Sequence, residues 1–92
     1  MRVKTRNGKL NVTVMGNMAS SFLREFEKEL RYMGDKYDNI ADVSIDCTGK
    51  MHYKLYVTAK NGAKRMFIFS TTNTNTIRIY MRIVTTFLKS NS

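Results

Sequence analysis

His52 is the only histidine of the chain, and it stands in a basic stretch between Lys50 and Lys54. An imidazole titrates near neutral pH, so it is the first side chain to consider as a general acid or base. His52 has no obvious second proton carrier beside it. Cys47 is the only cysteine and every acidic residue precedes it, so the usual ligands of a metal ion do not cluster. The sequence favours a binding protein over an enzyme, with neither metal nor cofactor.

Positive charge is concentrated in the second half of the chain. The 92 residues include 16 Lys and Arg against 7 Asp and Glu, a net charge of +9. All the acids lie between Glu25 and Asp46, while residues 47–92 hold eight cations and no acid. An acid-free half is the electrostatic footprint of a protein that binds a polyanion, either nucleic acid or an acidic protein surface. The residues predicted to bind this partner are Lys50, His52, Lys54, Lys60, Lys64, Arg65, Arg78, Arg82 and Lys89.

Residues 50–70 predict the hairpin that carries most of these residues. Asn61-Gly62 favours a two-residue turn, which would pair Tyr56 with Phe67. This register puts Tyr53, Leu55, Val57, Met66 and Ile68 on a core face, and His52, Lys54, Tyr56, Thr58, Arg65, Phe67 and Phe69 on the other. Phe67 and Phe69 would then need a cover, supplied by the N-terminal segment or by a second copy in a homodimer through this aromatic face.

The first half of the chain predicts a second hairpin and a helix. Residues 1–15 alternate around Asn7-Gly8, and a two-residue loop would pair Val3 with Val12. An apolar stripe at helical spacing predicts a helix over 18–33, with Gly34 just beyond its end. The stripe consists of Phe22, Phe26, Leu30 and Met33, and Asn17, Ser20 or Ser21 could cap the helix.

The remaining segments complete an α+β fold in one domain, 1–92. Residues 42–70 read as a three-stranded meander, in which a loop at 48–50 pairs Ile45 with Tyr53. Residues 75–89 fit either a strand or a helix, and the longer apolar stripe favours the helix. We expect an N-terminal β-hairpin, then an α-β-β-β-α core: an antiparallel sheet with two helices packed on one face. The absence of a long apolar segment, the polar start and the lone cysteine predict a cytoplasmic protein without membrane contact.

Three segments carry a resemblance to known proteins: TGKMHYKLYV, the N-G-x-K-R hairpin, and TIRIYMRIVTTFLK. The order of elements resembles the double-stranded-RNA-binding domain, and Phe22–Lys89 resembles the HicA toxins, small ribonucleases built on that fold. Small phage and prophage proteins carry a similar TGK-strand-NG-KR-strand segment. The resemblance implies a small RNA-binding protein of phage or mobile-element type. Met51 occupies the position of the catalytic histidine of HicA toxins, so HicA-like ribonuclease activity would depend on His52.

An acidic protein partner implies a different function from nucleic-acid binding. A basic phage protein of this size could instead inhibit a host defence or nucleic-acid machine, as anti-CRISPR proteins do. Sequence alone leaves three readings in order of preference: nucleic-acid binding, inhibition through an acidic protein surface, and HicA-like RNA cleavage.

Overall fold

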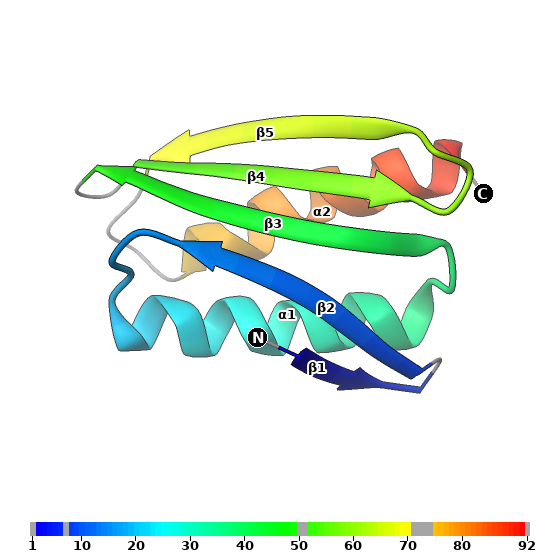
Figure 1. Ribbon diagram of the computed structural model, residues 1–92, viewed down its shortest axis with the longest axis horizontal. Coiled ribbons are helices and arrows are strands. Elements are labelled where there is room, and N and C mark those ends of the chain that lie inside the picture. Colours follow the sequence, from blue (N-terminus) through cyan, green and yellow to red (C-terminus); the bar gives the residue numbers. More distant parts are fainter. Residues whose placement is uncertain (1, 7, 50–51, 71–74, 92) are drawn as a thin grey trace.

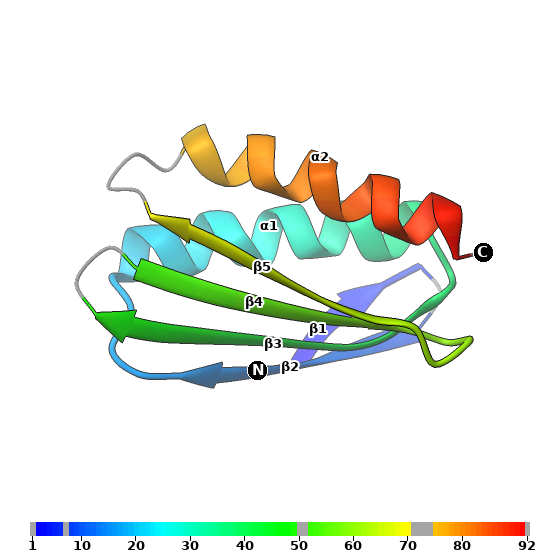
Figure 2. The ribbon, with the colours of Figure 1, turned by 90° about the horizontal axis from the view of Figure 1, so that it is seen from above.

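Two helices cover one face of a five-stranded sheet in the computed structural model, which describes residues 2–6, 8–49, 52–70 and 75–91 (Figures 1 and 2). The strands lie in the order β1-β2-β3-β4-β5. The elements are β1 (Arg2–Thr5), β2 (Gly8–Met15), α1 (Ser20–Lys36), β3 (Ile40–Gly49), β4 (His52–Ala59), β5 (Lys64–Ser70) and α2 (Asn75–Ser90). The α+β class and the placement of both helices on one face are confirmed.

The sheet is mixed, so the expectation of an antiparallel sheet is wrong at one place. Strand β2 pairs with β3 in parallel, with Val12 opposite Val43 and Val14 opposite Ile45. Parallel neighbours need a long crossover, and α1 supplies it. The N-terminal hairpin is therefore part of the main sheet, where buried Leu10 and Val12 extend the core wall.

Two of the predicted strand registers are wrong by two residues, which leaves every side chain on its expected face. Strand β1 pairs Val3 with Leu10, while Asn7 of the predicted turn lies outside the described residues. Strands β3 and β4 pair Ile45 with Leu55, with an irregularity between Cys47 and Gly49. The apolar faces expected for these strands are buried.

The turn between β4 and β5 contains one residue more than expected. The Ala59 amide donates to the carbonyl of Ala63 (2.8 Å), and the Gly62 amide donates to the carbonyl of Ala59 (2.9 Å). Lys60, Asn61 and Gly62 thus form a three-residue loop that closes with Gly62 at φ 93°, a conformation glycine adopts without steric cost.

This one-residue shift turns β5 over relative to the prediction. Leu55 now faces Phe67, and Tyr53 faces Phe69. Phe67 and Phe69 are buried, whereas Met66 and Ile68 lie on the exposed face. Arg65 likewise lies on the helix side, opposite buried Val57. The predicted assignment of all five residues is wrong, because an odd shift exchanges the two faces of a strand.

Helix α1 follows the predicted stripe but ends later than predicted. Phe22, Phe26, Leu30 and Met33 are buried as expected. Gly34 lies inside the helix and not just beyond its end as predicted. A Cβ there would collide with the side chain of Thr5, so the close approach of β1 requires glycine at this position. The helix begins after Ala19 without a side-chain cap, so the predicted capping by Asn17, Ser20 or Ser21 is wrong.

Helix α2, and not the N-terminal segment, covers Phe67 and Phe69. The predicted helix over 75–89 is confirmed. The Tyr80 ring stacks on Phe69 with centroids 4.4 Å apart, and Phe87 meets Phe67 edge-on at 6.2 Å. A homodimer through an exposed Phe67–Phe69 face therefore has no basis, since both rings are covered within one chain.

An aromatic stack ties both helices to the sheet. Phe22 of α1 lies flat against Tyr53 at 4.1 Å, Tyr53 contacts Phe69 at 5.3 Å, and Phe69 contacts Tyr80 of α2. Burial, and to a lesser degree the neighbouring Cys47, raise the pKa of the Tyr53 hydroxyl above its usual 10.0. In the described part of the chain, neither helix is long and apolar enough to cross a membrane.

Candidate nucleic-acid interface

The exposed side of α2 carries three of the predicted cations in one row. Arg78, Arg82 and Lys89 are all exposed and follow each other at four and seven residues. With a rise of 1.5 Å per residue, these intervals are about 6 Å and about 10 Å along the helix axis. Residues at such spacings share one side of a helix. Because α2, β4 and β5 contain no acidic residue, neutralising carboxylates must come from elsewhere.

Arg78 and Arg82 border a groove between α1 and α2 with a volume of about 440 Å³. Its lining combines four cations with a single carboxylate and several less polar side chains: Lys28, Glu29, Tyr32, Met33, Lys36, Arg78, Met81, Arg82 and Thr85. The carboxylate is weakly engaged, since the Arg78 Nε lies 3.9 Å from Glu29 Oε1 and the Arg78 side chain is 67% exposed. The 3.9 Å separation is at the limit for an ion pair and the Arg78 end is exposed to solvent, so the pair contributes little and Arg78 remains available to a ligand.

Sequence reasoning missed the α1 side of this groove. The residues on this side belong to a stretch whose net charge is negative, so a count of charge by segment did not identify them. The residues concerned are Lys28, Tyr32 and Lys36. Their spacing of four residues was the available signal, because it places all three on one side of a helix. Tyr32 is 62% exposed, and the Lys36 ammonium lies 6.0 Å from the centre of its ring.

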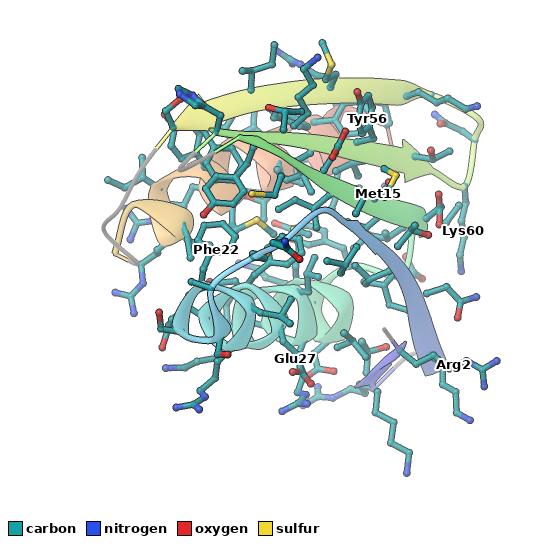
Figure 3. The ribbon with its side chains drawn as sticks, turned by 60° about the vertical axis from the view of Figure 1, so that its left-hand side comes forward. Arg2, Met15, Phe22, Glu27, Tyr56 and Lys60 are labelled. Carbon is teal, nitrogen blue, oxygen red and sulfur yellow. The ribbon has the colours of Figure 1, made fainter. Side chains whose placement is uncertain are left out.

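Three other predicted cations lie, together with Lys89, around the end of the molecule where the β4–β5 turn meets the end of α2. The turn and the helix end are joined by a hydrogen bond from Asn61 Nδ2 to Asn91 Oδ1 (3.4 Å). Arg65 lies on the helix side of β5, with its guanidinium 5.3 Å from the centre of the Phe67 ring. The residues at this end are Lys60, Lys64, Arg65 and Lys89; Lys60 is labelled in Figure 3.

Two further predicted residues, His52 and Lys54, lie away from the groove. His52 and Lys54 are on the open face of the sheet, the face opposite the helices, because they alternate with buried Tyr53 and Leu55. His52 Nδ1 hydrogen-bonds Ser70 Oγ at 2.7 Å. Lys54 stands opposite Asp46 of β3. Lys50 is outside the described residues, among which no group of three His, Cys, Asp or Glu could hold a metal ion.

Nine predicted contact residues therefore do not form one site. The structure brings Arg78 and Arg82 together with Lys28 and Lys36, gathers a second cationic set at the turn end, and separates His52 and Lys54 from both. Comparisons of the chain with protein-family models, curated proteins and solved structures find no match. The resemblance to HicA toxins and to the double-stranded-RNA-binding domain stays a prediction.

Proposed function

We propose that this protein binds nucleic acid, RNA in preference to DNA, along the cationic side of α2 and the groove between α2 and α1. The observation that carries the proposal is the convergence of Lys28, Lys36, Arg78 and Arg82 on one groove with a single carboxylate. Lysine and arginine side chains neutralise phosphates and release condensed counterions, which supplies most of the sequence-independent affinity for nucleic acids. The preference for RNA rests on the element order that resembles the double-stranded-RNA-binding domain.

Tyr32 adds a means of holding an unpaired base. Its ring is 62% exposed and lies between Lys28 and Lys36 on the groove side of α1. Bases of single-stranded RNA stack on exposed aromatic rings while neighbouring cations meet the phosphates. A groove with this composition fits a single strand or an unpaired loop, with phosphates on both helices and a base on Tyr32.

The salt dependence of binding tests the groove directly. The double variant Arg78→Gln/Arg82→Gln should bind RNA more weakly, and the slope of log affinity against log salt should become shallower by about 1.5 to 2, because two phosphate contacts are lost. A gel-shift or fluorescence titration with RNA, duplex DNA and single strands across salt measures both quantities. Salt-independent affinity of the unmodified protein would contradict the proposal.

A matched control distinguishes the loss of a particular binding surface from the loss of net positive charge. Lys4 and Lys9 are both exposed and stand opposite each other on β1 and β2, at the β1 edge of the sheet. Neither residue lines the groove. Lys4→Gln/Lys9→Gln removes the same charge and should leave affinity and salt slope nearly unchanged. Equal weakening by the two double variants would show that no particular surface is used.

A pull-down with and without nuclease distinguishes a nucleic acid from an acidic protein. Loss of captured partners after nuclease treatment supports the proposal. Nuclease-resistant capture of one protein, abolished by Arg78→Gln/Arg82→Gln, would instead favour an inhibitor that binds an acidic surface.

The position of His52 favours binding without cleavage. Its imidazole lies on the open face of the sheet, whereas the groove lies between the helices on the other face. RNA held in the groove would therefore not reach the imidazole. RNA incubated with the unmodified protein and with His52→Ala should stay intact in both cases. Cleavage that disappears in the variant would establish the HicA-like ribonuclease instead.

A further inference from the structure

The outer edge of β5 is unpaired in the part of the chain that the structure describes. It is the last strand in the order of the sheet, and nothing lies beyond it in Figure 1. Proteins usually protect such an edge with charges, proline or a bulge. Here Lys64 and Arg65 occupy only the start of the strand, and Met66–Ser70 contains no charge or proline. The register with β4 runs through the described strand without a shift.

Exposed apolar side chains flank this edge on the open face of the sheet. Met66 is 46% exposed and Ile68 is 62% exposed, although both belong to a strand with buried alternate residues. Tyr56 of β4 stands directly opposite Met66 and is 39% exposed. Figure 3 shows Tyr56 together with Met15 of β2, which lies farther from the edge.

One exposed isoleucine of α2, Ile83, flanks the same edge on the helix side. Ile83 falls three residues after Tyr80 and four before Phe87, and both of these rings contact β5. Ile83 therefore lies on the β5 side of α2, away from the groove that Arg78 and Arg82 border. Ile79 lies one turn before it on the exposed side of the helix, also outside the groove lining. Ile79 is 59% exposed and Ile83 is 44% exposed. Exposed apolar side chains therefore border the unpaired edge on both faces of the sheet.

We propose that β5 of a second copy of this chain pairs antiparallel with this edge, joining two sheets in a two-fold dimer. Full-length pairing of the seven-residue strand puts Phe67 at the two-fold axis and sets Met66 opposite Ile68 of the second copy. Lys64 then stands opposite Ser70, so the cations of the two copies lie at opposite ends.

The helices support the same arrangement. A two-fold axis perpendicular to the sheet keeps both α2 helices on one side of the joined sheet, so the Ile83 side chains on the β5 sides of the two helices face each other. The edge is thus complementary to itself in hydrogen bonding, apolar side chains and charge position. An acidic peptide would find no cation along Met66–Ser70 to pair with, which favours a second copy as the occupant. The dimer does not depend on nucleic-acid binding.

Sedimentation equilibrium of the nucleic-acid-free full chain, from about 1 μM to about 1 mM, tests the dimer. The unmodified protein should approach twice the 10.7 kDa mass of one chain. Ile68→Lys and Ile83→Lys should each weaken association at least tenfold, because each places a cation in the apolar contact. Met15→Lys is the matched control, since Met15 is 41% exposed on a different strand of the open face; it should leave association unchanged. Circular dichroism verifies that all three variants are folded.

Each result has a defined meaning. Concentration-dependent dimers that Ile68→Lys and Ile83→Lys disrupt and Met15→Lys preserves support the proposal. A monomer at all concentrations overturns it, as do dimers that resist both edge variants or that only Met15→Lys disrupts. Amide hydrogen exchange gives a second readout: amides of β5 should become more protected as protein concentration rises, and protection independent of concentration would contradict strand pairing.

Discussion

Replacing neighbouring residues of β5 distinguishes the observed strand register from the one that a two-residue turn would give. Phe69 is 3% exposed, and its ring lies 5.3 Å from Tyr53 and 4.4 Å from Tyr80. Removing a buried phenylalanine side chain costs about 3 to 5 kcal/mol of unfolding free energy. Ile68 is 62% exposed, so Ile68→Ala should cost only about 0.5 to 1 kcal/mol. The two-residue turn predicts the reverse order.

Urea unfolding followed by circular dichroism, at a protein concentration low enough to keep the chain monomeric, measures this difference. With a slope of about 1 kcal/mol per molar urea for a small domain, Phe69→Ala should lower the midpoint by about 3 M or more. Since small domains have about 5 to 15 kcal/mol of stability, Phe69→Ala could leave too little to measure. Phe69→Leu is then the gentler comparison, with an expected loss of about 1 to 2 kcal/mol. A loss from Ile68→Ala that equals or exceeds the loss from Phe69→Ala or Phe69→Leu would refute the observed register.

Two further predictions concern a backbone contact and a buried hydroxyl. Gly16 has φ 82° and a Cβ there would lie 2.5 Å from the carbonyl oxygen of Cys47, whereas Gly62 has φ 93° with open space around it. Gly62→Ala should therefore cost about 1 kcal/mol and Gly16→Ala about 3 kcal/mol in the same denaturation assay; equal losses would contradict the close contact. The raised pKa of Tyr53 means that the unfolded chain loses this proton first. Unfolding free energy should thus fall as pH rises above about 10, and a Tyr53→Phe variant with the same decline would exclude Tyr53 as a cause.

The helices were predictable from sequence because their signal is local. An apolar stripe such as Phe22, Phe26, Leu30 depends only on spacing within one segment, and burial follows the stripe. Strand register instead depends on loop geometry, and Asn61-Gly62 is compatible with loops of two or three residues. Errors of two residues preserved the buried faces, whereas the single extra residue before β5 exchanged them.

The candidate site was predictable only in part, because it combines segments with opposite net charge. Arg78 and Arg82 belong to the acid-free half and were identified from charge. Lys28 and Lys36 lie within the acidic segment, and only the packing of α1 beside α2 brings them to the same groove. The parallel pairing of β2 with β3 was also beyond local reasoning, because it joins residues on opposite sides of an entire helix.

That parallel pairing has a consequence for how the chain reaches its fold. Val12 pairs with Val43, so 31 positions of chain must be closed into a loop before β2 contributes to the sheet. Thr58 and Lys64, by contrast, are only six positions apart. Contacts between distant residues form slowly because the entropy of loop closure is lost before they stabilise anything. The meander of β3, β4 and β5 can assemble from local hairpins, and docking of the N-terminal hairpin beside it becomes the slow step of folding.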